Sequence, residues 1–289
     1  MVEPPKLTRR PTPEQVYRRR VTALVLLALL TAVAVWIAWM TLRTHKTSAP
    51  PPTTTVAPPK VVKVLFPEGF TRAEMAQRAA VSSRAISARA YLAASASSPL
   101  PGRFAGDGKP RSLEGFLFPA TYEIYETDKA QRLVDKQVEA FRLSWGKVNL
   151  TYARSKNLTS YDVLIIASMI EKEAVVESER PLIAAVIYNR LRARMPLGID
   201  ATLRYGLGIP GTESITRQDL ASDSPFNTRK FPGLPPTPIA NPGLKSIQAA
   251  AHPATANYLY FVAKPDKRHH FFTASFDEFN RYKAAHGYQ

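Results

Sequence analysis

A pair of glutamates near the end of a strongly apolar segment carries the clearest chemical signal in this sequence. Residues 167–174 read ASMIEKEA, so one lysine separates Glu171 from Glu173. In a helix that turns about 100° per residue, Glu173 falls on the stripe that contains Ile166 and Met169. A carboxyl group among such side chains loses hydration, and its pKa rises. A glutamic acid that stays protonated near neutral pH can give its proton to a leaving oxygen, as cleavage of a glycosidic bond requires.

The spacing also fits a purely structural role for these glutamates. Glu171 falls on a different face from Glu173, near the small side chains of Ala167 and Ser168. One glutamate would then cap a helix or pair with a nearby arginine such as Arg180 or Arg190, and the other would be solvated. Spacing alone leaves both interpretations open.

Helices on both sides of the glutamates are predicted from capping residues and periodicity. TSYD at 159–162 matches a capping box, which predicts a helix from there to about Ala174. A second helix, ERPLIAAVIYNRLRAR, is predicted to begin after Ser178 as its N-cap. In that helix Asn189 lies on the same side as Leu182, so its amide meets either a loop carbonyl or a ligand.

The region before these helices mixes strand and helix signals. VVKVLF at 61–66 predicts a short strand, and TRAE at 71–74 is a capping box that opens a short helix. A helical stretch at about 83–94, a strand-and-turn segment at 113–125 and a long helix at about 129–145 follow. We therefore expect an α+β fold.

An uncharged segment near the N-terminus predicts a membrane anchor. Residues 21–40 contain no charged side chain, and a helix of that length spans about 30 Å, the thickness of the hydrocarbon core of a bilayer. Trp36 and Trp39 lie near its end, where interfacial aromatic residues belong. Basic residues concentrate upstream, so the N-terminus is expected inside and the rest of the chain outside.

These signals divide the chain into consecutive segments. We expect a cytoplasmic basic tail at 1–20, a transmembrane helix at 21–42, a Pro/Thr-rich linker at 43–60, a mixed α/β accessory region at 61–158 and a catalytic domain at 159–289. The linker composition cannot form a core and favours an extended tether.

Composition narrows the classes of function. The 289 residues include 39 Lys and Arg against 23 Asp and Glu, a formal net charge of +16, and no cysteine. The lack of cysteine excludes a disulfide scaffold, a thiolate metal site and a cysteine nucleophile. The positive charge favours an anionic surface, and no zinc-finger, basic-zipper or aromatic–basic sheet signature points to nucleic acid. Acidic lipids or an acidic wall polymer are the expected partners.

One histidine pair has the chemistry of metal ligands. His269 and His270 follow Asp266, but adjacent histidines in a strand face opposite sides, and no third histidine lies at ligand spacing. We expect the pair to be solvated or at a cleft edge. No metal and no cofactor are predicted.

A series of short motifs resembles one enzyme family. ASMIEKEA, a Glu-Arg pair, VIYNRL and DATLRYG at 200–206 look like the catalytic domain of the endolytic murein transglycosylases, the MltG or YceG-like family. The match continues in LEGFLFPATY at 113–122, SPFNT at 224–228, GLPPTPIANPG at 233–243, AAAHPA at 249–254 and YLYFVAK at 258–264. The resemblance covers roughly residues 60–280.

The resemblance implies non-hydrolytic cleavage of the β-1,4 bond between N-acetylmuramic acid and N-acetylglucosamine in nascent peptidoglycan. One glutamate acts first as acid and then as base, and the product ends in a 1,6-anhydro ring. By similarity to lysozyme-like lytic transglycosylases this glutamate is Glu173, which leaves Glu171 a structural or orienting residue. The matching motifs imply substrate-binding roles for Glu114, Asn189, Asp200, Thr202, Tyr205, Asn227, Thr228 and Asn241.

The resemblance also implies an architecture and a location. The catalytic domain would be lysozyme-like, and the accessory region would be an abbreviated LysM-like module. A single pass through the cytoplasmic (inner) membrane would place the catalytic domain on the outer face. The implied partners are peptidoglycan glycan strands, the membrane and peptidoglycan synthases of the elongation or division machinery.

The sequence departs from the family pattern at two positions. Ala174 follows the catalytic candidate where Ser or Thr is usual, and Ala120 stands where Asp is common. A non-catalytic peptidoglycan-binding or divisome scaffold is therefore an alternative function. A lysozyme-type muramidase is another, and it needs a carboxylate about 5–10 Å from Glu173, with Glu114 and Asp200 as candidates.

Overall fold

The structure is a computed structural model that describes residues 12–44, 60–97, 100–101, 104 and 112–288. The chain forms two units, Met1–Ala57 and Pro58–Gln289. Parts of the basic tail predicted at 1–20 and most of the linker predicted at 43–60 lie outside the described residues, so both stay predictions.

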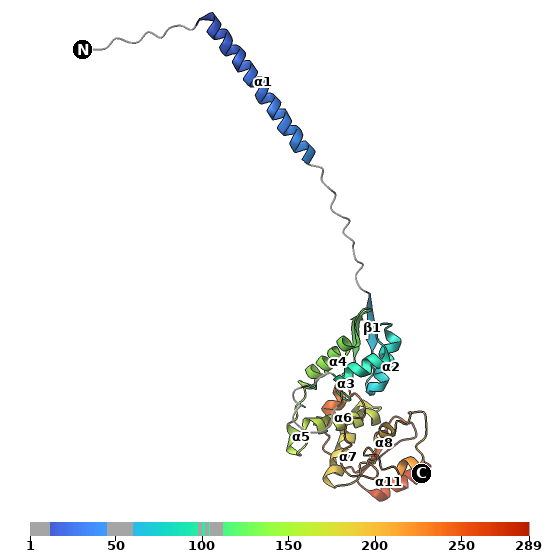
Figure 1. Ribbon diagram of the computed structural model, residues 1–289. Helices are drawn as coiled ribbons and strands as arrows, with labels where there is room; N and C mark the ends of the chain where they lie inside the picture. Colours follow the sequence, from blue (N-terminus) through green and yellow to red (C-terminus); the bar gives the residue numbers. More distant parts are fainter. Residues whose placement is uncertain (1–11, 45–59, 98–99, 102–103, 105–111, 289) are drawn as a thin grey trace, which may run out of the picture. The chain divides into compact units, whose positions relative to one another are not determined.

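The described residues of the first unit, 12–44, form one long helix. Helix α1 (Pro13–Thr44), blue in Figure 1, includes the uncharged segment and extends upstream through Arg18, Arg19 and Arg20. Pro13 suits the first turn because no backbone N–H donor is needed there. From Pro13 to Arg43 the helix is long and apolar enough to cross a membrane. At its end the guanidinium of Arg43 lies 3.7 Å from the ring centroid of Trp39.

The second unit opens with a two-stranded sheet. Strand β1 (Val61–Leu65) pairs antiparallel with β2 (Thr121–Tyr125), and Val64 lies opposite Tyr122. Both of these residues are buried, whereas Leu65 is exposed. This alternation is typical of a sheet that is covered on one face.

Three helices belong to the same region as the sheet. Helix α2 (Arg72–Ser82) contacts β1, α4 (Ala130–Trp145) contacts β2, and α3 (Ala88–Ser97) contacts both helices. The capping box predicted for α2 is confirmed, with the Glu74 amide donating to Thr71 Oγ1 at 3.2 Å. Helix α3 begins later than the predicted residue 83, because Ser83 ends α2 and Ser87 caps α3 by accepting from the Ala90 amide.

The candidate glutamates lie on the central helix of the second group of elements. Helix α6 (Ser160–Glu173) contacts α7 (Arg180–Arg192), α8 (Asp200–Leu207) and α10 (Leu244–Ala251). The short helices α5 (Thr151–Ser155) and α9 (Arg217–Leu220) complete the group. The predicted capping box of α6 is confirmed, because the Asp162 amide donates to Thr159 Oγ1 at 3.1 Å.

The predicted start of α7 is wrong. Ser178 is not its N-cap, because the 3-10 helix η2 (Glu177–Glu179) precedes it and α7 begins at Arg180 with Glu179 as N-cap. Pro181 fits the first turn, where its missing N–H is not needed. The side chain of Glu179 does not cap the helix but bonds to His270.

The described chain ends in a hairpin followed by a helix. Strands β3 (Tyr260–Ala263) and β4 (His270–Thr273) pair antiparallel, and α11 (Phe276–Ala285) packs against them. The rings of Phe271 and Tyr282 stack with centroids 4.3 Å apart.

One hydrophobic core extends through the second unit. It runs from Val64 in β1 to Ala251 in α10, and the rings of Phe116 and Tyr161 stack at 6.2 Å across the predicted boundary at residue 158. The mixed helix-and-strand class is confirmed. The division into an accessory region and a catalytic domain stays a prediction, as does the LysM-like character of residues 61–158.

Candidate active site

Glu173 is the last residue of α6, where the chain leaves the core. Ile166 and Ile170 on the preceding turns are fully buried, and Ala174 continues in an extended conformation. Glu173 keeps a partial opening to solvent. Within the described chain no hydrogen bond or ion pair reaches its carboxyl group. Burial therefore acts almost unopposed and raises the pKa of Glu173 to about 7.

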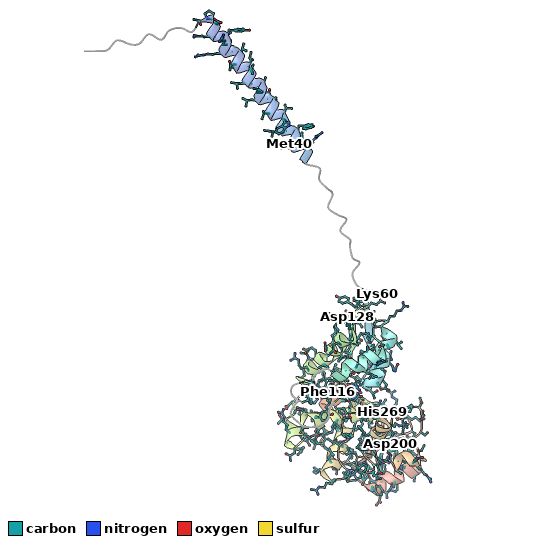
Figure 2. All side chains as sticks on the ribbon, viewed as in Figure 1. Met40, Lys60, Phe116, Asp128, Asp200 and His269 are labelled. Carbon is teal, nitrogen blue, oxygen red and sulfur yellow. The ribbon has the colours of Figure 1, made fainter. Side chains whose placement is uncertain are left out.

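A charged pair from two other segments influences this glutamate. Arg229 Nε donates to Asp200 Oδ1 at 2.5 Å, and both side chains are about half exposed. Asp200, labelled in Figure 2, is the first residue of α8. After burial, the negative charge of Asp200 is the next cause of the raised pKa of Glu173, and the positive charge of Arg229 opposes it. The protonation of Glu173 therefore depends on the start of α8.

Glu114 is a second carboxyl group with a raised pKa, and it is 3% exposed. Its oxygens accept from the Arg72 amide at 3.0 and 3.1 Å, from the Tyr205 hydroxyl at 3.1 Å and from Asn241 Nδ2 at 2.8 Å. Burial raises the pKa of Glu114 to about 7 although the bonds from Arg72 and Tyr205 lower it. This carboxylate thus joins the start of α2, helix α8 and the proline-rich 233–243 segment.

Asn241 connects the same elements through its amide. Its Oδ1 accepts from the Leu117 amide at 2.9 Å, and its Nδ2 donates to the Phe70 carbonyl at 2.9 Å as well as to Glu114. The side chain is fully buried. The predicted substrate-binding role of Asn241 gains no support from this geometry, because the amide is already bonded within the protein.

Four further predicted substrate ligands are also buried and bonded within the protein. Asn189 donates to the carbonyls of Ala256 and Tyr258, each at 2.9 Å, which matches the loop-carbonyl alternative. The hydroxyls of Thr202 and Thr228 lie 2.9 Å apart. Asn227 donates to the carbonyls of Leu220 at 3.0 Å and Ser222 at 2.9 Å. These side chains fix the loops around the site, and direct sugar contact by them stays an unsupported prediction.

Glu171 is buried and bonded within the protein. Its Oε1 lies 3.3 Å from the guanidinium of Arg180, and its Oε2 accepts from the Gly243 amide at 2.9 Å. The side chain is 5% exposed, so this is a buried ion pair. The contacts join α6 to α7 and to the start of α10, as expected for an orienting residue.

A cavity of about 430 Å³ adjoins the carboxyl group of Glu114. Its lining also includes Tyr205, Lys172 and Ala201. Glu173 is not part of the lining. However, Lys172 directly precedes Glu173 in the sequence, and Ala201 directly follows Asp200.

The histidine pair divides between two acidic partners. His269 Nδ1 lies 2.8 Å from Asp266 on the surface, whereas His270 Nδ1 lies 2.7 Å from Glu179 and both of these side chains are about one-tenth exposed. The solvated alternative is thus wrong for His270, and the cleft-edge alternative stays a prediction. Glu179 is part of the Glu-Arg motif noted in the sequence. The spacing of that motif gave no indication that Glu179 would bond to His270, which lies far along the chain. No group of three or more His, Cys, Asp or Glu in the described part of the chain is arranged to hold a metal ion.

Comparison with known proteins settles the family. The sequence profile of the YceG-like family matches residues 42–285. The chain belongs to the YceG-like family. A crystal structure of a yceG-like protein from Listeria monocytogenes superimposes with a TM-score of 0.69 at 31% identity, covering 79% of this chain and 77% of that one.

Curated relatives of this YceG-like protein carry a functional name. The endolytic murein transglycosylase of Bacillus subtilis (strain 168) is 39% identical over 171 residues, 59% of this chain and 47% of that protein. The endolytic murein transglycosylase of Streptococcus pneumoniae serotype 2 is 36% identical over 178 residues, 60% of this chain and 32% of that protein. The matched part of the chain thus spans less than half the length of these relatives.

Proposed function

We propose that this protein is an endolytic lytic transglycosylase that cleaves the bond between N-acetylmuramic acid and N-acetylglucosamine in nascent peptidoglycan. One observation carries the proposal. Glu173 ends a buried apolar helix with a partly open carboxyl group whose pKa is raised to about 7. A carboxylic acid poised near neutral pH can both give and take a proton, and this reaction needs one group to do both.

Glu173 acts first as the general acid. Its proton passes to the glycosidic oxygen as the bond from C1 of the muramyl residue breaks, and positive charge develops on the sugar ring. The N-acetylglucosamine part leaves as a neutral alcohol. Glu173 is then a carboxylate, placed beside an oxocarbenium-like centre that its negative charge stabilises.

Glu173 acts next as the general base. It removes the proton from the C6 hydroxyl of the same muramyl residue while that oxygen bonds to C1. The 1,6-anhydro ring closes, Glu173 is protonated again, and no water is consumed. A second catalytic carboxylate is not required, so the pair Asp200–Arg229 has the role of setting the charge around Glu173.

Asp200 also supports a second candidate reaction, because its charge acts on Glu173. In a lysozyme-type muramidase a second carboxylate acts as nucleophile or activates a water, and the product is reducing-end muramic acid. The ion pair with Arg229 favours the charge-setting role instead, since a carboxylate held by a guanidinium is a weaker nucleophile or base.

We further propose that α1 anchors the enzyme in the cytoplasmic membrane with its N-terminus inside. Its uncharged segment and upstream basic residues support this orientation. The second unit would then meet new glycan strands close to the bilayer, where peptidoglycan synthases are the expected partners. Residues 61–158 would act as the strand-positioning accessory region.

The decisive experiment is a product analysis with the full-length protein in detergent micelles. Mass spectrometry of digested peptidoglycan should find 1,6-anhydromuramyl ends with the wild type and none with Glu173→Gln. Glu213→Gln is the matched control, because that glutamate is exposed and should leave the products unchanged. Reducing muramic acid ends would establish the muramidase, and unaltered glycan with the wild type would refute catalysis.

A further inference from the structure

The cavity beside the site combines apolar walls with unbalanced positive charge. It lies among the first turn of α2, the last turn of α6, helix α8 and the 208–211 turn, and the side chains of Leu92, Ile209 and Ile239 form apolar parts of its wall. Its volume of about 430 Å³ falls within the roughly 300–1,000 Å³ of small-molecule sites. The cavity is therefore large enough to hold a short chain of amino-acid size.

The guanidinium of Arg72 is a positively charged group available for a ligand in this cavity. Its backbone amide bonds to Glu114, but among the described residues its guanidinium has no hydrogen bond or ion pair. Arg72 is half-buried and lines the cavity. Arg204, also in the lining, differs because its guanidinium already donates to the carbonyls of Pro210 at 2.9 Å and Glu213 at 2.7 Å.

The acidic groups in the lining make no hydrogen bond or ion pair with this guanidinium, although the charge of Glu114 acts on it. The carboxylate of Glu114 accepts from three separate groups, and Glu74 Oε2 accepts from the Thr71 amide in the capping box. Lys172 adds a second positive charge, and its Nζ has only a 3.3 Å contact with the Gly69 carbonyl. A ligand with a carboxylate would therefore complement the cavity, with Arg72 able to bind it in a bidentate manner.

A neutral sugar fits this lining less well than an acidic peptide does. Sugar hydroxyls need free hydrogen-bonding groups, whereas Tyr205, Glu114 and Arg204 are already bonded within the protein. Alkyl side chains match the apolar walls, and peptide carboxylates match Arg72 and Lys172. In peptidoglycan both are found in the stem peptide, which is attached to the muramyl residue.

Two residues of the cavity lining are direct chain neighbours of Glu173 and Asp200. Neighbouring Cα atoms are about 3.8 Å apart, so the Cα of Glu173 lies that far from Lys172 and the Cα of Asp200 that far from Ala201. Lys172 and Ala201 both line the cavity. A group attached to a muramyl residue at Glu173 can thus reach into it.

We propose that this cavity binds the stem peptide of the glycan strand, with the Arg72 guanidinium bound to a peptide carboxylate. The inference rests on the proposed function, since it assumes that the glycan strand occupies the groove at Glu173. It makes the enzyme selective for strands that still carry their peptides.

The test compares peptide-bearing strands with strands from which an amidase has removed the peptides. The amidase hydrolyses the amide bond between the lactyl group and the peptide, so denuded strands lack the peptide but carry a free lactyl carboxylate on the sugar. For the full-length wild type in detergent, kcat/KM should be about tenfold higher on peptide-bearing strands, the size of a charge-assisted hydrogen bond. Arg72→Ala should bring the ratio close to one, and Arg72→Lys should restore part of it.

Arg84→Ala is the matched control, because Arg84 is exposed in the same unit and outside the cavity lining. It should keep the wild-type ratio. Equal cleavage of both substrates by the wild type would overturn the peptide site while leaving the proposed function intact. An equal loss on both substrates in Arg72→Ala would identify a sugar subsite instead and would also overturn it. A wild type that cleaves neither substrate would refute the proposed function and the inference together.

Discussion

The hydroxyl of Tyr205 donates to the buried carboxylate of Glu114 at 3.1 Å. This bond joins the segment before β2 to helix α8, whose first residue is Asp200. Asp200 in turn influences the protonation of Glu173. This buried hydrogen bond is thus one of several contacts between the part of the chain predicted to be accessory and the part predicted to be catalytic.

Removal of the Tyr205 hydroxyl should lower the stability of the folded protein. In Tyr205→Phe the ring remains and only the bond to Glu114 is lost. At pH 8, where Glu114 is ionised, the free energy of unfolding should fall by about 1.5–3 kcal/mol, as for a hydrogen bond to a charged group. Urea unfolding followed by the fluorescence of buried Trp145 would measure the change. Tyr152→Phe is the control, since that side chain is exposed, and an equal effect in both variants would contradict the prediction.

The stability should also decrease as the pH rises through the neutral range. The pKa of Glu114 is about 7 in the folded protein and 4.5 when unperturbed, so the folded state holds a proton that the unfolded state has lost. The contribution of this group is fully present below pH 4.5 and is lost as the pH rises through 7, a difference of about 3 kcal/mol.

Glu114→Gln isolates that contribution. The unfolding free energy should be measured from pH 4.5 to 8. It should decrease less steeply with pH in the variant than in the wild type, whatever the absolute stability of the variant. An unchanged slope would show that Glu114 does not carry the proton.

The proposed acid predicts the shape of the pH–rate profile. Because Glu173 must be protonated for the first step, kcat/KM should decline as the pH rises above about 7. Glu173→Gln should lower kcat by about 10²–10⁴-fold, the typical contribution of a general acid. Release of soluble anhydro-products over pH 5–9 provides the measurement. A flat wild-type profile would remove Glu173 from the acid role.

Asp200→Asn should move this decline to lower pH. The negative charge of Asp200 raises the pKa of Glu173, and without it the charge of Arg229 would lower that pKa further. Activity at pH 7 should therefore fall a few-fold while the anhydro product stays the same. Asp223→Asn, at an exposed aspartate paired with Lys230, should leave the profile in place. Complete loss of activity in Asp200→Asn at every pH would instead favour the muramidase.

Local signals predicted the elements around the site well. The capping boxes at Thr71 and Thr159 involve residues three positions apart, so the pattern contains the whole interaction. The direction of Asn189 also followed from helical periodicity, although its partners, Ala256 and Tyr258, did not.

Interactions between distant segments could not be predicted from the sequence. Glu114 receives its hydrogen bonds from Arg72, Tyr205 and Asn241, and no short pattern connects these positions. The partner of Glu179 was missed for the same reason, because its carboxylate bonds to His270, which lies far along the chain. In both cases the hydrogen-bond partner of a buried polar side chain comes from a distant segment of the chain.

The continuous core across residue 158 limits how this protein can be divided. If the chain were cut there, Phe116 and Tyr161 would each lose an aromatic neighbour. Both fragments would then expose hydrophobic surface to water. Modular exchange of the N-terminal half between relatives should therefore yield insoluble chimaeras unless the matching face is transplanted with it. Exchange at the junction near residue 58, where the second unit begins, should leave this core intact.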